Sequence, residues 1–175
     1  ILTPILLTPW IHGNDGLGYY MIMRSFWIDN DLDFTNDIDH FDEKFPDLHF
    51  PTSPITQKPY THYGIGNAIL WTPFFAAAHI TVIVHNIIAE IKIPDDGFSY
   101  PYIMFVSFGS AFLAWCAVVM TYKIAKQFAS QYAALFGTLL LWFATPLIYY
   151  MYFSPTVSHA NSFFAVTLFI FYWYH

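Results

Sequence analysis

Charged residues are scarce in this chain. Only 10% of its 175 residues are Asp, Glu, Lys or Arg, whereas 57% are hydrophobic and 22% are aromatic. Soluble domains carry charge at about a quarter of their positions. The composition therefore excludes an ordinary soluble domain and indicates an integral membrane protein.

Basic residues and cysteine are also few. Six Lys and Arg stand against twelve Asp and Glu, which gives a formal net charge of -6. Nucleic-acid binding requires a basic face, so that class of partner is excluded. The single cysteine, Cys116, lies in an apolar run. One cysteine excludes a disulfide framework within the chain and a metal site built from cysteines.

Long runs without charge fill the second half of the sequence. We expect transmembrane segments at 65–88, 97–122 and 132–152, and a fourth run that begins near Asn161 and continues past His175. Residues 1–13 are apolar but too short to cross a bilayer, so we interpret them as the end of a first transmembrane helix whose beginning is missing. The predicted fold class is an all-α integral membrane protein, with a multi-spanning helical bundle at 65–175 and a long extracytoplasmic first loop at 14–64 that carries juxtamembrane helices.

The orientation of these segments is open. If every run spans the membrane and the acidic loop lies outside, Lys123 and Lys126 also lie outside, against the positive-inside tendency. If 65–90 is instead a re-entrant or interfacial hairpin, or a pair of half-spans, both lysines become cytoplasmic and the turn at 154–160 joins the acidic loop on the outer face. We favour the second arrangement.

Carboxylates are concentrated before the first long apolar run. Nine of the twelve lie between Trp10 and Asp47. Within this stretch, residues 14–28 predict an amphipathic helix capped by Asn14 or Asp15. Its aromatic residues suit the level of the lipid headgroups, with ring bodies in lipid and polar tips in water; these are Tyr19, Tyr20, Phe26 and Trp27. Residues 29–62 predict a long extramembrane loop, which is uncommon unless it is functional.

Asp29, Asp31 and Asp33 are spaced like the first ligands of a calcium-binding loop. Such a loop also needs Gly at its sixth position and Glu at its twelfth, where this chain has Phe34 and His40. The EF-hand match therefore fails. Coordination of Mg²⁺, Mn²⁺ or Ca²⁺ by oxygen atoms of this triplet stays open, beside the alternative of a solvated acidic loop.

Asp15 is an isolated carboxylate where the chain leaves the membrane. Gly13 and Gly16 flank it closely, and glycine permits a ligand to approach the backbone. Partial desolvation at such a boundary favours the protonated form and raises basicity, as a general base requires. The alternative is that Asp15 only caps the following helix.

Several short motifs follow one another along nearly the whole chain. They are HGNDGLGYY at 12–20, RS at 24–25, DNDLDF at 29–34, YGIGNAILWTPFF at 63–75, TPLIYY at 145–150 and SHA at 158–160. Together they resemble the N-terminal part of bacterial multi-spanning glycosyltransferases of the GT-C superfamily. Better known members of that superfamily are the protein O-mannosyltransferases and the lipid A aminoarabinose transferases.

The resemblance implies a catalytic acid in the first extracytoplasmic loop, which corresponds to Asp15, and a polyprenyl-phosphate sugar as donor. It implies transfer to a glycan, lipid or protein acceptor at the outer face of the bacterial cytoplasmic (inner) membrane, in a multi-pass protein. Those relatives have a second acid after the first, whereas Asp15 is followed by Gly16. Dependence on a divalent cation is thus left open.

A lipid-phosphate sugar also requires cations and apolar contacts. Arg24 offers a bidentate match to phosphate oxygens and Lys58 a point charge, while Tyr19 and Tyr20 offer ring faces for the prenyl chain. His159 could donate to the phosphate or act as an acid-base group. The alternatives are a snorkelling Arg24 and a structural His159.

A non-enzymatic function competes with the transferase. A transporter or channel subunit would use the acidic loop as a vestibule that concentrates cations. Such a protein predicts acids or broken helices at the depth of the membrane centre. The apolar runs 65–89, 97–122 and 127–175 contain no carboxylate, which favours the enzyme.

Overall fold

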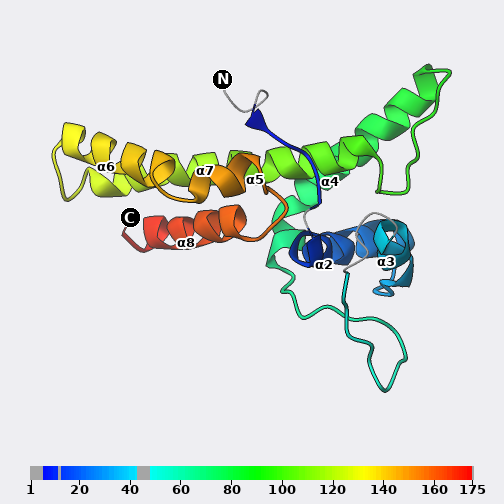
Figure 1. Ribbon diagram of the computed structural model, residues 1–175. Coiled ribbons are helices and arrows are strands. Elements are labelled where there is room, and N and C mark those ends of the chain that lie inside the picture. The colour runs from blue at the N-terminus through cyan, green and yellow to red at the C-terminus, as the bar shows by residue number, and fades with distance from the viewer. Residues whose placement is uncertain (1–5, 12, 43–47, 175) are drawn as a thin grey trace.

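The computed structural model describes residues 6–11, 13–42 and 48–174, and within these ranges every regular element is a helix apart from one isolated bridge between Thr52 and Pro59. The predicted all-α class is confirmed for this part of the chain (Figure 1). The elements are α2 (Gly13–Arg24), the π-helical segment η1 (Ser25–Asp29), α3 (Thr35–Asp42), α4 (Gly66–Ile88), α5 (Tyr100–Ala125), α6 (Gln131–Phe143), α7 (Leu147–Tyr152) and α8 (His159–Tyr174).

Two of these helices, α4 with 23 residues and α5 with 26, are long and apolar enough to cross a membrane. Their lengths correspond to about 35 and 39 Å at a rise of 1.5 Å per residue, compared with a hydrocarbon core of about 30 Å. Helix α6 is apolar but shorter. The membrane character expected from composition therefore rests on α4 and α5.

Helix α4 is continuous, so the predicted hairpin or pair of half-spans at 65–90 is wrong. Pro73 lies inside it and cannot donate a backbone hydrogen bond. The helix continues because the other backbone hydrogen bonds of this long apolar segment hold it. A single proline in a long apolar run was not enough to divide it.

The connection after α4 folds back along that helix. Asn86 and Ile93 form two hydrogen bonds of 2.8 Å: the Asn86 side-chain amide donates to the Ile93 carbonyl, and the Ile93 backbone N–H donates to Asn86 Oδ1. These bonds fix the start of the returning connection. Further on, the Gly97 carbonyl accepts from the Tyr20 hydroxyl and the Asp96 carbonyl accepts from Arg24 Nε at 2.8 Å. The connection that leads into α5 therefore contacts α2.

This return places the two lysines far from the acidic region, although α4 is one helix. Lys123 lies in the last turn of α5, at the opposite end from the contact with α2. The turn between α7 and α8 lies by α2, because a methyl group added to Gly16 would meet Thr156 Oγ1 at 2.8 Å. Lys123 therefore lies far from α2 and the turn at 154–160 lies near it, as in the arrangement that we favoured, although residues 66–88 form a single helix.

Helix α5 packs through small residues. Ser107, Ser110, Ala111, Ala114 and Ala117 are buried on it. Small side chains let helix backbones approach closely, and α8 and α6 lie along the C-terminal half of α5 (Figure 1). Ala111 and Ala114 form one hydrophobic cluster with α7 and the start of α8, separate from a second cluster built on α2, α3, α4 and the first turns of α5.

Three predicted boundaries need correction. The predicted run 132–152 is two helices, α6 and α7, because Pro146 follows a turn that ends α6 at Phe143. The region 29–62 is not entirely a loop, since α3 lies within it. The last apolar helix begins at His159, slightly before the predicted start near Asn161.

Candidate active site

Asp15 lies in the first turn of α2, as the third residue of the helix, and its side chain is exposed. The helix begins at Gly13, whose φ of 54° is left-handed and suits glycine. Neither Asn14 nor Asp15 is therefore the N-cap. A carboxylate in the first turn of a helix is stabilised by the helix dipole. The site thus presents an oxygen acceptor that no other part of the described chain covers.

Tyr63 holds this carboxylate. Its hydroxyl donates a hydrogen bond to Asp15 Oδ1, and its ring lies 4.7 Å from that of Tyr19. Burial, together with the hydrogen bond to Asp15 and its negative charge, raises the pKa of Tyr63 well above its usual value. Tyr63 therefore stays protonated and remains a donor at physiological pH.

Glycine is required where the Tyr63 ring meets α2. A Cβ at Gly18 would lie 2.1 Å from that ring, and a Cβ at Gly16 would lie 2.8 Å from the Thr156 hydroxyl. The glycines after Asp15 thus admit protein side chains, not a ligand as we predicted for Gly16. Gly13 is different, because no atom lies within 4 Å of a Cβ placed there.

A polar cleft of about 250 Å³ lies beside the Asp15–Tyr63 pair, between α2, the start of α4 and the start of α8. Its lining contains no Asp, Glu, Lys or Arg; it consists of Tyr19, Gly64, Gly66, Asn67, Leu70, Ser158, Asn161, Ser162 and Ala165. Tyr19 and Gly64 each neighbour a member of the pair, in contact or in sequence. Tyr19 thus connects the cleft to Tyr63, which in turn contacts Asp15.

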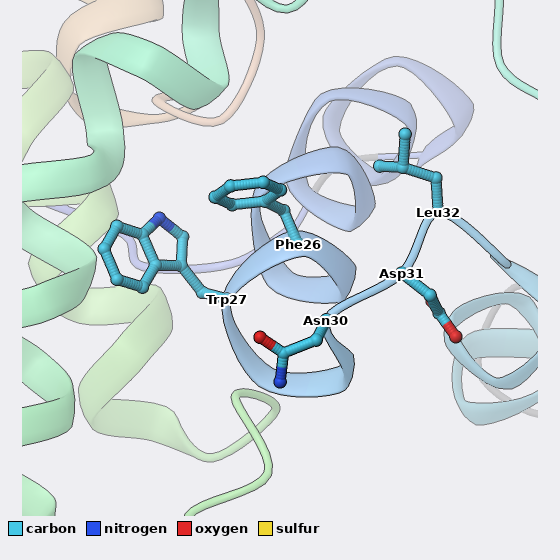
Figure 2. A pocket seen from close by; sticks show the side chains of 5 residues that line it. All are labelled: Phe26, Trp27, Asn30, Asp31 and Leu32. Atoms are coloured by element: carbon cyan, nitrogen blue, oxygen red, sulfur yellow. The ribbon is translucent and has the colours of Figure 1, made fainter.

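An apolar groove lies between α2, η1 and α4. One hollow of about 290 Å³ is lined by residues that include Ile22, Trp27 and Ile69, and a second of about 510 Å³ shares Phe26, Trp27 and Leu32 with it. Figure 2 shows Phe26 and Trp27 projecting from η1, with Asn30 and Asp31 where the chain leaves it. Phe26 and Leu32 are 60% and 62% exposed. This groove offers an apolar chain a place to lie.

Arg24 is buried instead of facing a ligand. Its guanidinium forms a salt bridge with Asp29, donates to the Asp96 carbonyl and lies 4.0 Å over the Phe98 ring. Asp37 Oδ2 lies 3.6 Å from the same group. We therefore assign Arg24 to the core that joins α2 to the connection before α5, in place of the predicted phosphate contact.

Lys58 is exposed and forms a salt bridge of 2.7 Å with Asp33. This pair lowers the pKa of Asp33 to about 2 and raises that of Lys58, in each case mainly through their hydrogen bond. Of the two predicted cations, only Lys58 has an accessible charge.

The aspartate triplet does not converge. Asp29 pairs with Arg24, Asp33 with Lys58, and Asp31 Oδ1 accepts from the backbone N–H of Asp33. Within the part of the chain that the structure describes, no three His, Cys, Asp or Glu side chains gather closely enough to share an ion. Each aspartate of the triplet thus has a partner within the protein, and metal dependence stays a prediction.

Of the other predicted site residues, Tyr19 and His159 lie at or next to the cleft and Tyr20 does not. Tyr19 lines the polar cleft, and His159, the first residue of α8, packs its ring 4.1 Å from that of Tyr150, next to cleft residue Ser158. Tyr20 is fully buried and donates to the Gly97 carbonyl. Burial raises its pKa well above its usual value. The predicted headgroup position of Tyr20 is therefore wrong, whereas Phe26 and Trp27 are exposed.

Sequence reasoning did not identify Tyr63 or the two cleft asparagines, Asn67 and Asn161, as site residues. Tyr63 lies 48 positions from Asp15, and the asparagines lie 94 positions from each other. The available signal was the spacing of Gly16 and Gly18 on one helix, which indicates close approach by other side chains. It did not indicate which ones.

Comparison with known proteins gives no relative: no family model, no curated protein and no solved structure matches this chain.

Proposed function

We propose that this chain belongs to a membrane glycosyltransferase, which moves a sugar from a polyprenyl-phosphate donor to an acceptor hydroxyl at the outer face of a bacterial cytoplasmic membrane. The observation that carries the proposal is the position of Asp15. It is an exposed carboxylate held by Tyr63, whose ring contacts Tyr19 in the wall of an uncharged cleft, and an apolar groove lies on the same helix. A sugar and a prenyl chain require these two environments.

In the proposed reaction Asp15 accepts the proton of the acceptor hydroxyl while the oxygen attacks the anomeric carbon. The bond from that carbon to the phosphate oxygen breaks, the electron pair leaves with the polyprenyl phosphate, and the configuration inverts. Tyr63 orients the carboxylate so that one oxygen remains for the acceptor. His159 and the exposed Lys58 are the candidate donors to the leaving phosphate.

The membrane assignment is supported by α4 and α5, which have the length and composition of spans. The competing transporter predicts acids or broken helices at the depth of the membrane. The described helices α4 to α8 contain no Asp or Glu, and the two helices long enough to span, α4 and α5, are unbroken, although the predicted run 132–152 is divided into α6 and α7. The separation of Lys123 from the region around α2 agrees with cytoplasmic lysines and an external Asp15.

Substitution of Asp15 by Asn tests the proposal. The amide keeps the size of the side chain, and its oxygen can still accept the hydrogen bond from Tyr63. It cannot take up the proton of the hydroxyl that attacks the sugar. We expect turnover to fall by about 10² to 10⁴ with an unchanged yield of folded protein. The control is Asp39→Asn, which neutralises an exposed carboxylate on α3 and should leave turnover unchanged.

The assay is sugar transfer from a polyprenyl-phosphate donor by the full-length protein in liposomes. A purely structural role for Asp15, through the helix dipole, predicts normal turnover and a stability loss of about 0.3 to 1 kcal/mol. Normal turnover by Asp15→Asn refutes the assignment of the general base.

A further inference from the structure

The polar cleft between α2, α4 and α8 contains a buried pair of side-chain amides with unused hydrogen-bonding capacity. Asn67 on α4 and Asn161 on α8 are 5% and 1% exposed, and both line the cleft. Asn161 Nδ2 donates to Asn67 Oδ1 at 3.2 Å. The other two amide atoms, Asn67 Nδ2 and Asn161 Oδ1, have no hydrogen-bond partner among the described residues.

Unpaired buried polar atoms are uncommon because each has lost its hydrogen bonds to water. Here one of the two is a donor and the other an acceptor, and they belong to amides that already touch. A hydroxyl group both donates and accepts. One hydroxyl can therefore donate to Asn161 Oδ1 and accept from Asn67 Nδ2, whereas an ammonium group can only donate and a carboxylate or phosphodiester can only accept.

The rest of the lining agrees with an uncharged, hydroxylated ligand. It includes the hydroxyls of Ser158 and Ser162 and the ring of Tyr19, but no ionised side chain. Of the groups that normally meet a phosphate or carboxylate, the cleft has no Arg or Lys and only the N-termini of α4 and α8. Aromatic rings beside amides and hydroxyls suit a sugar, which has apolar C–H faces and polar edges.

Two glycines keep the cleft open. Gly64 and Gly66 line its wall, and a Cβ built on either meets no atom within 4 Å. Neither has a positive φ, so the backbone does not require glycine there. Gly66 is the first residue of α4, where a side chain would be tolerated by the helix. A larger side chain at either position therefore has room beside the cleft without displacing other residues.

We infer that this cleft binds a neutral sugar, with Asn67 and Asn161 recognising one of its hydroxyl groups and Tyr19 contacting its ring. The inference deepens the proposed function and rests on it for the reaction, since Tyr19 and Tyr63 connect the cleft to Asp15. Binding itself is independent of the reaction and can be measured separately.

The experiment uses saturation-transfer NMR on the full-length protein in nanodiscs, with methyl glycosides of glucose, galactose and mannose as probes and inorganic phosphate as the charged comparison. We expect at least one glycoside to bind, and Gly66→Leu to weaken that binding at least tenfold by filling the cleft. The matched control is Gly137→Leu on α6, where a Cβ also meets no atom within 4 Å but the residue lies outside the cleft.

A second pair of variants tests the amides. Asn161→Ala should weaken binding of the methyl glycoside at least fivefold, and the corresponding deoxy sugar lacking the recognised hydroxyl should bind wild type and Asn161→Ala equally. If Asn161→Ala fails to fold, Gly66→Leu still decides the matter, because it removes no contact. The inference is overturned if no neutral glycoside binds, if Gly66→Leu binds like wild type, or if phosphate competes for the cleft.

The result is distinguishable from failure of the proposed function. If Gly66→Leu abolishes sugar binding while Asp15→Asn has normal turnover, the cleft is a sugar site but Asp15 is not the general base. If transfer depends on Asp15 but Gly66→Leu does not affect it, the protein is a transferase but the cleft is not its sugar site.

Discussion

The buried carboxyl of Asp37 should make the region around α2 and α3 sensitive to pH. It lies on α3 with no exposed surface, accepts from the Ser25 hydroxyl at 2.7 Å and has Arg24 at 3.6 Å. Its second oxygen has no partner among the described residues. Burial outweighs the hydrogen bond from Ser25 and the charge of Arg24, and raises the pKa of Asp37 to about 7; Asp29 and Asp31 add to the rise.

The sign follows from the protons bound in each state. An unfolded aspartate has a pKa of 3.8, so between about pH 4 and pH 7 the folded state holds a proton that the unfolded state has lost. Stability is therefore highest below about pH 4 and falls as the pH rises through 7. A difference of about 3 pKa units corresponds to a loss of at most about 4 kcal/mol, at about 1.4 kcal/mol per unit.

Asp37→Asn imitates the protonated form at every pH. We expect it to match wild type near pH 4 and to be the more stable protein at pH 8, by up to about 4 kcal/mol. The assay is hydrogen exchange of the amides in η1 and α3 of the full-length protein at both pH values, with Asp39→Asn as the control on the same helix. A difference between Asp37→Asn and wild type that does not grow with pH would refute this reasoning, as would a carboxyl ¹³C titration of Asp37 with a midpoint below pH 5.

Two further predictions concern the site and its orientation. A Cβ at Gly18 would lie only 2.1 Å from the Tyr63 ring, so Gly18→Ala should displace that ring, break the hydroxyl contact with Asp15 and lower turnover at least tenfold, although alanine alone would favour the helix by about 1 kcal/mol. Gly137→Ala is the control, and a normal rate in both variants contradicts the role of Tyr63. In a background without Cys116, an impermeant thiol reagent should label Asn36→Cys but not Ala129→Cys in intact cells, and the reverse pattern would show that the acidic region is cytoplasmic.

The part of this fold that could be predicted from the sequence is the part that depends on neighbours along the chain. The charge-free runs gave α4 and α5, because a helix in an apolar environment satisfies its own backbone. Asp15 could be singled out for the same kind of reason, since it stands alone between small residues before an aromatic helix. The break between α6 and α7 was missed although Pro146 marks it, because the apolar character continues across it.

Charge alone misled the interpretation of Arg24 and of the aspartate triplet. From the sequence, Arg24 and the three aspartates were expected to be free to bind a ligand or an ion, because the region is polar. The five-residue spacing in the π-helical segment brings Arg24 to Asp29, and the return of the connection before α5 covers the guanidinium with Asp96 and Phe98. A charged side chain in an acidic segment is as often part of a buried network as of a binding site.

The sequence by itself determined that the described chain is helical, that two of its helices have the length and composition of membrane spans, and that its acids gather before them. These properties follow from composition and local periodicity. Only the tertiary structure decided that the connection after α4 returns to α2, that Tyr63 holds Asp15, and that Asn67 meets Asn161 across a cleft. Each of these contacts joins residues far apart in the chain, and its geometry depends on how whole helices pack, which no local pattern of residues specifies.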